Sequence, residues 1–458
     1  MKARRVFVLL VTLVLPPLRG HEARATQAPP EPLTSDQKLW GLMQVWAETK
    51  FNFVYFDQVP GLDWDEAVQT SIPRVLATRD RFEYYQVLRE LVARLDDGHT
   101  LILPPGALTG EYDNPQIELQ MVEGKAVVTR VGDTQEIREA SLRPGLELVT
   151  IGDGVPVWEY FEGNVARFYR GGTEQWTKAF GLYLLLNAPR GTRVKLGFRD
   201  PEGRSHTAEL TRDSRNADGS SFVHWLFGHQ SSLEYRTIAG DLAYFRLPSF
   251  GSEHLVKEFT RELDRLELDR LRGMIVDVRV NNGGNSENAY AIISRLIDRE
   301  IETSRWKTRQ YLPARRSWGE AETWFEANPG RIAPAEGRTY KGPLVVLIGP
   351  NTVSAAEDFL VPLDYSDRAI LVGRTTAGTT GNPLRVPLPG GGLFQVCTKR
   401  DTYPDGKEFV GHGIEPDYRI EPTQLEVWQN RDRALEKAVE ILGGDGRPAE
   451  TKLGLPKT

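Results

Sequence analysis

After residue 33, two stretches carry apolar side chains at helical spacing. The first follows Thr34, where the sequence Thr-Ser-Asp-Gln is typical of a helix start with a capping box. The second begins near Asp80 and ends at residues 96–98, where Gly98 suits the left-handed position just past a helix end. We therefore predict a helical N-terminal region that places the next residue, His99, at a fixed corner of the chain.

Short alternating runs replace this pattern between about residues 115 and 212. Residues 125–131 and 192–198 are expected to be strands, separated by turns rich in Gly and Pro. The sequence therefore predicts a small, mostly β module over residues 111–215, after a helical region over residues 26–110.

Continuous apolar runs and amphipathic segments alternate in the second half of the chain. The runs are typical of strands buried on both faces of a sheet, and they cover residues 242–247, 274–278, 344–348 and 370–372. Helical segments are expected between them, over residues 253–268, 286–297 and 354–363. This alternation predicts an α/β core over residues 216–425, followed by a C-terminal helix and tail over residues 426–458.

A long polar connection over residues 300–342 interrupts the core. It contains Trp306, Trp318 and Trp324. Because connections of this length are more often functional than idle, we expect a lid or a substrate-facing loop. An idle surface excursion is the alternative.

The first residues indicate export. Lys2, Arg4 and Arg5 precede an apolar run over residues 6–15, and a small-x-small site follows at residues 23–25. This order describes a cleavable signal peptide over residues 1–25, so we expect a periplasmic or extracellular protein. The apolar run is shorter than the ~20 residues that span a bilayer, and no later stretch is apolar enough, so we expect no integral membrane span.

Composition narrows the partners and cofactors. Lys and Arg number 57 against 63 Asp and Glu, and the resulting net charge of −6 without a long basic block argues against nucleic acid as a partner. The single cysteine, Cys397, excludes an intrachain disulfide and a CxxC metal site. The seven histidines form no ligand pair such as HExxH, so we expect no built-in metal site.

A glycine-rich turn over residues 277–285 follows one predicted strand and precedes a helix. Gly283 and Gly284 allow positive φ angles there and let backbone N–H groups approach a ligand. A turn needed only for chain reversal is the alternative.

A second turn, over residues 349–357, places Ser354 at the start of a helix. A nucleophilic hydroxyl at this end would have the helix dipole and the Ala355 N–H to stabilise the negative charge on an attacked carbonyl. The alternative is a structural cap, because Ser354 and Glu357 fit a capping box. If the two turns lie side by side, the amides of Gly283 and Gly284 form an oxyanion hole beside Ser354.

Several stretches of the chain, in order and spacing, resemble the tail-specific, or C-terminal processing, serine peptidases and their tricorn-like relatives (peptidase family S41). The matching stretches are residues 95–100, 277–284, 351–357, 372–378 and 411–417. The resemblance implies a crotonase-like ββα spiral as the α/β core and Ser354 as the nucleophile. It also implies a PDZ-like β module, on residues 142–157 and 190–192.

The resemblance leaves the base to be chosen. Bacterial processing peptidases use a lysine shortly after a Thr-Thr-x-Gly turn, and Thr379 occupies that place here. Tricorn-like members use the histidine of a Gly-His-Thr motif, which is His99. An imidazole titrates near ~6.5 and can act as a base at neutral pH. Lys399 and Lys407 are fallback bases.

A carboxylate is expected to orient the imidazole of His99. Glu408 is the candidate in the C-terminal stretch where tricorn-like enzymes carry theirs, although Val410 falls on that position in another register.

These features predict an exported serine peptidase that cleaves protein or peptide substrates through an acyl-enzyme on Ser354, with His99 as general base. The oxyanion is expected on the amides of Gly283, Gly284 and Ala355. This peptidase chemistry needs no cofactor. A catalytically silent protein that binds a peptide or an apolar ligand on the same scaffold is the alternative, because the dyad lysine is absent. The oligomeric state stays open.

Overall fold

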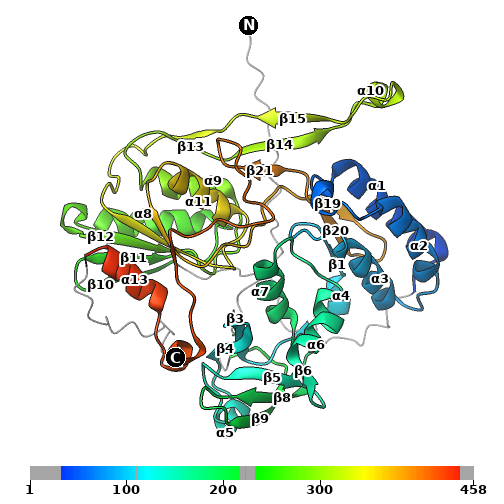
Figure 1. The fold of residues 1–458 in the computed structure, drawn as a ribbon, viewed down its shortest axis with the longest axis horizontal. Coiled ribbons are helices and arrows are strands. Elements are labelled where there is room, and N and C mark those ends of the chain that lie inside the picture. Colours follow the sequence, from blue (N-terminus) through cyan, green and yellow to red (C-terminus); the bar gives the residue numbers. More distant parts are fainter. Residues whose placement is uncertain (1–31, 110–111, 217–221, 223–232, 444–458) are drawn as a thin grey trace, which may run out of the picture.

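The computed structural model describes residues 32–109, 112–216, 222 and 233–443. The predicted signal peptide over residues 1–25 lies outside these ranges. Within them the chain forms a helical N-terminal region, a small β module and a larger α/β core (Figure 1). Among the helices of these residues, none combines the length and the apolar character of a membrane span.

Three capped helices form the N-terminal region. They are α1 (Ser35–Asn52), α2 (Trp64–Leu76) and α3 (Arg81–Ala93), with the short 3-10 helix η1 (Phe56–Gln58) after α1. The predicted capping box is confirmed, because Gln37 N donates to Thr34 Oγ1 at 3.2 Å and Thr34 N donates to Gln37 Oε1 at 3.0 Å. Asp80 caps α3 as expected, whereas the sequence pattern did not predict α2.

The corner before His99 differs from the predicted helix end. Asp96, with a φ of 46°, is the left-handed residue there, and Gly98 is not. Gly98 is required for space instead, since a Cβ at this position would lie 2.6 Å from Thr379 Oγ1. The glycine therefore allows the His99 corner to approach a segment far along the chain.

A small antiparallel sheet joins the N-terminal region to the C-terminal half. Its strands are β1 (Leu101–Leu103), β20 (Leu393–Val396) and β19 (Leu384–Pro387), in that order. Next to it, Gln395 Nε2 donates to the His99 carbonyl at 3.1 Å, and Cys397 N donates to Thr100 Oγ1 at 3.0 Å. These contacts hold His99 against residues 296 positions later in the sequence.

The β module is an antiparallel sheet with its own hydrophobic core. Its strands in spatial order are β3 (Ile117–Val122), β4 (Lys125–Val131), β5 (Glu147–Ile151), β8 (Arg193–Arg199) and β9 (Ser205–Thr211), with β6 (Val155–Pro156) beside β5. The predicted strand over residues 125–131 is confirmed as β4, and the strand predicted over residues 192–198 is β8, one residue later.

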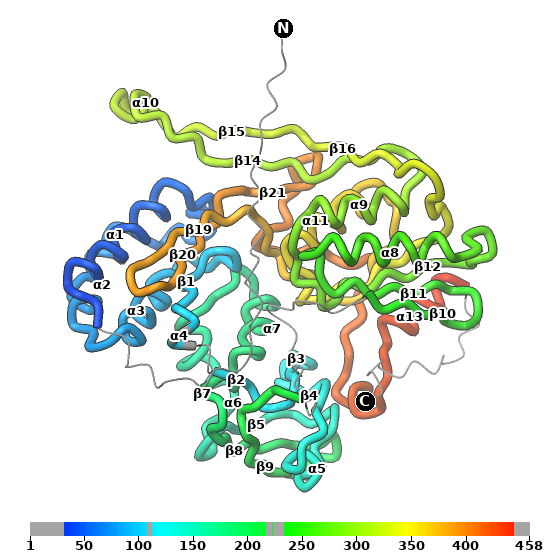
Figure 2. The backbone as a smooth tube through the Cα atoms, turned by 180° about the vertical axis from the view of Figure 1, so that it is seen from behind, coloured from blue at the N-terminus to red at the C-terminus, as the bar shows by residue number. Residues whose placement is uncertain are grey.

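Helices and short elements complete the module. They are α4 (Gly106–Thr109), β2 (Tyr112–Asp113), α5 (Gln135–Glu139), α6 (Val157–Phe161), η2 (Glu162–Ala166), α7 (Glu174–Leu184) and β7 (Ala188–Pro189). Seen from both sides, α7 lies on the face of the module that is turned toward the rest of the molecule (Figures 1 and 2).

The α/β core is built on a mostly parallel sheet. Its strands in spatial order are β10 (Glu234–Ile238), β11 (Leu242–Arg246), β12 (Gly273–Asp277), β17 (Leu344–Ile348), β18 (Ile370–Gly373) and β22 (Tyr418–Arg419). The pairs from β11 to β22 are parallel, and β10 is antiparallel to β11. The four predicted apolar runs correspond to β11, β12, β17 and β18.

Helices cover both faces of this sheet. On one face, α8 (Glu253–Arg265), α9 (Ser286–Ser294) and α11 (Ala355–Tyr365) contact alternate residues of the strands, such as Val276 and Val346. On the other face, α13 (Arg433–Ile441) contacts the residues between them, such as Ile275 and Val345. The strands are therefore buried on both faces, as their continuous apolar runs predicted.

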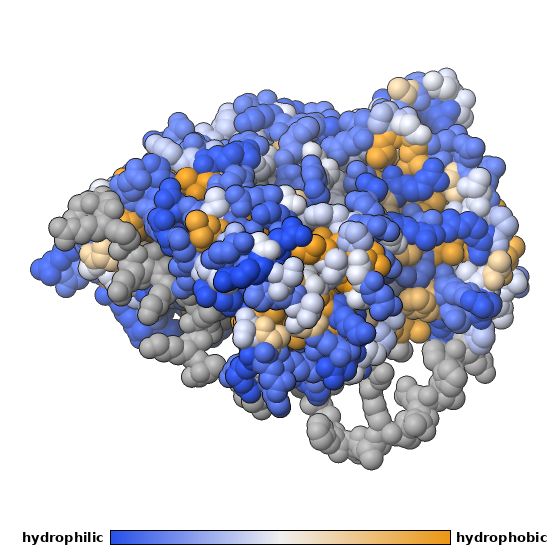
Figure 3. Space-filling model, turned by 60° about the horizontal axis from the view of Figure 1, so that its bottom comes forward, coloured by the Kyte–Doolittle hydropathy of each residue, from blue (hydrophilic) through white to orange (hydrophobic). Residues whose placement is uncertain are grey.

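The connection over residues 300–342 forms a projecting hairpin (Figure 1). Its elements are β13 (Ile301–Glu302), β14 (Arg305–Gln310), α10 (Pro313–Ser317), β15 (Thr323–Ala327) and β16 (Arg331–Ile332). Strand β14 pairs with β15 and with β21 (Arg400–Thr402), so the hairpin extends from the segment that carries Lys399. The remaining short elements are η3 (Leu268–Arg270) and α12 (Gln424–Trp428). Figure 3 shows a mostly polar surface with separate apolar patches.

A buried ion cluster attaches the C-terminal helix to the core sheet. Arg279 donates to Asp277 Oδ2 at 2.6 Å and to both oxygens of Asp432 at 2.8 Å. Asp432 also caps α13, and Tyr244 donates its hydroxyl to Asp277 Oδ2 at 2.8 Å. Burial alone raises the pKa of the Asp277 carboxyl, but the charge of Arg279 outweighs it and lowers this pKa to about 2.

Replacing Arg279 by Ala is expected to lower the free energy of unfolding by about 3 kcal/mol, because two buried carboxylates lose their cation. This lies at the lower end of the usual range, since 26% of the Arg279 side chain is exposed. Urea denaturation measures the change. The control is Arg270→Ala, whose ion pair with Glu267 lies at the surface and contributes less than about 1 kcal/mol. Equal losses in the two variants would contradict the structural role of the cluster.

Candidate active site

Ser354 lies at the turn between β17 and α11 in an unusual backbone conformation. Its φ of 59° and ψ of −123° fall outside the regions that a serine ordinarily adopts. Such strain persists only where surrounding contacts enforce it, and Ser354 N donates to the Thr379 carbonyl at 3.0 Å. The side chain makes no cap hydrogen bond to the helix, so the capping alternative is not supported and the hydroxyl is left for other contacts.

The structure brings His99 and Ser354 together. His99 Nε2 lies 3.1 Å from Ser354 Oγ, although 255 residues separate them in the sequence. His99 is buried, and its other ring nitrogen, Nδ1, lies 2.8 Å from Thr379 Oγ1. Burial, with a smaller contribution from the positive charge of Lys399, lowers the pKa of the imidazole to about 4. The ring is therefore neutral at physiological pH and can accept a proton.

Thr379, rather than a carboxylate, contacts the second nitrogen of His99. In the sequence, Thr379 is notable only because it occupies the place of the dyad lysine, and no role was predicted for it. The structure does not bring Glu408 to His99. Both of its oxygens accept from Arg400, at 2.6 and 2.7 Å, and Arg400 also donates to Asp57. The arginine draws Glu408 into an ion pair, which corrects the expectation that Glu408 orients the imidazole.

The fallback bases have other partners. Lys399 Nζ lies 2.9 Å from Asp401 Oδ1, and its influence on His99 is electrostatic. Lys407 Nζ lies 5.2 Å from the centre of the Tyr403 ring. Of the three candidate bases, His99 is the one in contact with Ser354.

The glycine turn lies directly against Ser354. A Cβ on Gly283 would come within 2.8 Å of Ser354 Cβ and 3.0 Å of the Ala355 nitrogen. Gly284, with a φ of 137°, packs against the backbone of Phe250 and Gly251, where a Cβ would lie 2.3 Å from the Gly251 nitrogen. The two predicted turns are side by side, as expected.

The amides of this turn are not equivalent. Gly283 N donates to Asn281 Oδ1 at 2.9 Å, so the expectation that Gly283 serves as an oxyanion donor is not supported. Within the described residues, the N–H groups of Gly284 and Ala355 have no hydrogen-bond partner. Ala355 is also the first residue of α11, where the helix dipole favours negative charge.

The β module reaches the site through α7. Thr173 Oγ1 donates to the Ala377 carbonyl at 2.6 Å, and Gln175 Nε2 donates to the Thr376 carbonyl at 3.1 Å. Trp176 is buried against Ala377 and Val353. The turn that carries Thr379 is therefore held from the module as well as from the core.

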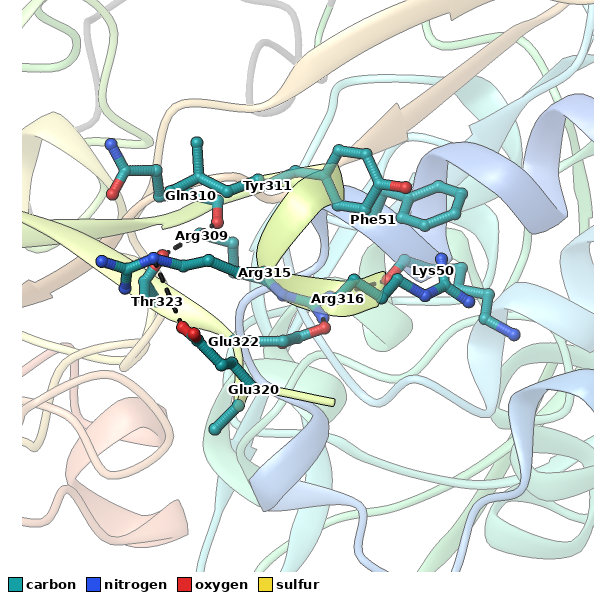
Figure 4. A pocket seen from close by; sticks show the side chains of 12 residues that line it. Lys50, Phe51, Arg309, Gln310, Tyr311, Arg315, Arg316, Glu320, Glu322 and Thr323 are labelled. Atoms are coloured by element: carbon teal, nitrogen blue, oxygen red, sulfur yellow. Dashed lines mark hydrogen bonds and ion pairs between the residues drawn. The ribbon is translucent and has the colours of Figure 1, made fainter. Parts of the chain in front are cut away.

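The described residues also form a cavity that is separate from the residues around Ser354. A cavity of about 210 Å³ lies between the end of α1 and the projecting hairpin, and its lining includes Lys50, Phe51 and Arg316 but none of the residues around Ser354 (Figure 4). In the described part of the chain, no group of three His, Cys, Asp or Glu side chains is arranged to hold a metal ion.

Known proteins resemble this chain in sequence. Residues 241–420 match the profile of peptidase family S41. The C-terminal processing peptidase of Tetradesmus obliquus chloroplasts is 24% identical over 93% of this chain and 84% of its own length. The carboxyl-terminal-processing protease of Synechocystis is 26% identical over 92% of this chain and 90% of its own length.

Solved structures share the fold. Mature CPAF complexed with lactacystin superimposes with a TM-score of 0.71 at 16% identity, over 89% of this chain and 98% of that one. The photosystem II D1 C-terminal processing protease gives 0.54 at 21% identity, over 91% of this chain and all of that one. With the family S41 profile over residues 241–420 and relatives that align along almost the whole chain, the comparisons identify this protein as a serine-type peptidase similar to those of family S41.

Proposed function

We propose that this protein is an exported processing peptidase that hydrolyses peptide bonds of polypeptide substrates through an acyl-enzyme on Ser354. The observation that carries the proposal is the 3.1 Å contact between His99 Nε2 and Ser354 Oγ, made by a neutral, buried imidazole. Relatives described as C-terminal processing proteases support cleavage near the carboxyl terminus of the substrate. Export rests on the predicted signal peptide.

In this proposal the contact between His99 and Ser354 serves every proton transfer that acylation and deacylation need. His99 Nε2 accepts the Ser354 hydroxyl proton while Oγ bonds to the scissile carbonyl carbon, and the imidazolium then gives that proton to the leaving amine. Water then attacks the acyl carbon while the same imidazole takes its proton, the ester bond to Oγ breaks, and the imidazolium returns the proton to Ser354 Oγ. For this role Nδ1 carries the ring proton and donates it to Thr379 Oγ1, 2.8 Å away.

The free amides of Gly284 and Ala355 are suited to hold the oxyanion. They belong to the two turns that meet at Ser354, and each lacks a partner among the described residues. A single donor of this kind contributes about 10²–10³ in kcat in other serine peptidases. In this proposal Gly283 acts sterically, by leaving room for Ser354.

The fold assignments implied by the resemblance belong to the same proposal. The antiparallel module with α7 is taken as PDZ-like and the α/β core as a crotonase-like spiral, supported by the likeness to mature CPAF over 89% of the chain. The domain boundaries of the sequence analysis and the lid role of residues 300–342 remain predictions.

The catalytic pair is tested with Ser354→Ala and His99→Ala on a denatured-protein or peptide library. We expect cleavage and labelling by a fluorophosphonate probe in the wild type, and a loss of at least about 10³-fold in both variants. Mass spectrometry of the cleaved termini also shows whether cuts lie near carboxyl ends. An unlabelled wild type that still binds peptide would favour the silent binding protein instead.

The pH dependence follows from the lowered pKa of His99. Only the neutral imidazole is a base, so the rate of fluorophosphonate labelling should rise with pH through about 4, rather than near 6.5. Lys399→Met removes a positive charge that disfavours the imidazolium, so its rise should move to higher pH. Rates between pH 3.5 and 7, with circular dichroism to confirm folding, measure both. A rise near pH 6.5 in the wild type would contradict a desolvated His99.

The steric role of Gly283 has a matched control. Gly283→Ala forces a Cβ against Ser354, and we expect labelling to fall by about 10²-fold because the nucleophile is displaced. Gly203→Ala imposes a similar positive φ, 86° against 93°, but its Cβ meets nothing within 4 Å. Normal labelling of Gly203→Ala and slow labelling of Gly283→Ala are expected. Equal rates in the two variants would overturn this role.

A further inference from the structure

Glu357 is a buried acid with an unusual set of partners. It lies on the first turn of α11, three residues after Ser354, and is fully buried. No Lys, Arg or His of the described residues forms an ion pair with it. A carboxylate buried without a cation is costly unless hydrogen bonds compensate. The contacts that stabilise this buried acid next to Ser354 therefore have to be identified.

Three hydrogen bonds join the Glu357 carboxyl group to the turn that carries Thr379, and the Ser354 backbone contributes a further one. Thr376 Oγ1 donates to Glu357 Oε1 at 2.6 Å, and Gly378 N donates to the same oxygen at 2.7 Å. Thr379 N donates to Glu357 Oε2 at 2.9 Å. All three groups are donors, so the carboxylate gathers this turn around both of its oxygens.

Thr379 in turn contacts both members of the catalytic pair. Its carbonyl accepts from Ser354 N at 3.0 Å, and its hydroxyl lies 2.8 Å from His99 Nδ1. A ring of contacts therefore runs from Glu357 through Thr379 to His99 and Ser354. It closes along α11, because Ser354 and Glu357 are neighbours on the same helix turn.

We propose that Glu357 is the positioning carboxylate of this active site, and that it acts on His99 through Thr379 instead of contacting the imidazole. The inference rests on the proposed Ser354–His99 chemistry. The Thr379 side chain could shift if nothing held its backbone. The hydrogen bond from Thr379 N to Glu357 fixes that backbone, and thereby the position at which Oγ1 contacts His99 Nδ1. This arrangement supplies the imidazole with a fixed neutral acceptor where a carboxylate was expected.

Both side-chain oxygens of Glu357 must act as hydrogen-bond acceptors, because each receives at least one N–H or O–H donor. A glutamine has the same size but would turn its NH₂ group toward one of the N–H or O–H donors, so at least one hydrogen bond is lost. Burial raises the pKa of Glu357 to about 8, against the opposing effect of its hydrogen bonds. Glu357 should therefore be fully ionised only above neutral pH, in a range where labelling rates can still be measured.

The test compares Glu357→Gln with the wild type and with Asp364→Asn. Asp364 is a carboxylate on the same helix that accepts a hydroxyl hydrogen bond, from Tyr403 at 2.5 Å, away from the Thr379 turn. We expect Glu357→Gln to lower kcat and the labelling rate by about 10–100-fold with KM within about twofold, since a small displacement of the base is enough. Asp364→Asn should keep wild-type rates.

Two further readouts separate positioning from a structural role. The wild-type labelling rate should rise again through about pH 8, and this second rise should be absent in Glu357→Gln. In a double-mutant cycle, Glu357→Gln with Thr379→Val should lose little more than the worse single variant, because both act through one contact. Fully additive losses, or a normal labelling rate in Glu357→Gln, would overturn the inference.

Two controls complete the design. A wild type that is not labelled at Ser354 would contradict the proposed function itself. A labelled wild type with a normal rate in Glu357→Gln would contradict only the role of Glu357. If Glu357→Gln does not fold by circular dichroism, Glu357→Asp replaces it, because its shorter side chain keeps the charge but withdraws it from the turn. A wild-type labelling rate in Glu357→Asp would then refute the positioning role.

Discussion

The meeting of His99 with Ser354 depends on strand pairing between distant parts of the chain. His99 immediately precedes the segment that enters β1, and β1 pairs with β20, which follows Ser354 in the sequence. The hydrogen bond from Gln395 to the His99 carbonyl and the one from Cys397 to Thr100 fix the chain directly after the imidazole. The ion pair between Arg400 and Asp57 and the hydrogen bonds from Arg309 to the Lys50 and Phe53 carbonyls attach the N-terminal region at further points.

Burial shapes the chemistry of the site more than neighbouring charge does. Desolvation is the largest cause of the lowered pKa of His99 and of the raised pKa of Glu357. It keeps the imidazole neutral and ready to accept a proton, without a carboxylate in contact with the ring. The same burial makes each polar contact important, because a group that loses its partner there cannot turn to water.

The two turns at the nucleophile divide their tasks. Gly283 is small because Ser354 occupies the space of its missing Cβ, and its N–H is used by Asn281. Gly284 and Ala355 keep their N–H groups free among the described residues. The Ser354 backbone is strained, and its hydroxyl faces His99 instead of capping the helix.

Local pattern was enough for most of the elements. The capping sequence after Thr34, the alternation in β4 and the continuous apolar runs of β11, β12, β17 and β18 all specified structures that form from neighbouring residues or from burial on both faces. Ser354 and His99 could be chosen as candidates because their motifs resemble those of a known peptidase family. The sequence also located the two turns, since paired glycines and a serine at a helix start are visible without coordinates.

The partners of each side chain needed the tertiary structure. Glu408 was a reasonable carboxylate for His99 until Arg400 was seen to hold it, and the same composition allowed Ser354 either to cap its helix or to face an imidazole. Thr379 gained its role only because Gly98 lets the N-terminal corner approach it closely. The sequence by itself determined most of the elements, because they depend on short-range periodicity, and it named Ser354 and His99 as candidates through their motifs. Which atoms meet was decided by long-range packing, because hydrogen-bond partners hundreds of residues apart are chosen by the folded geometry alone.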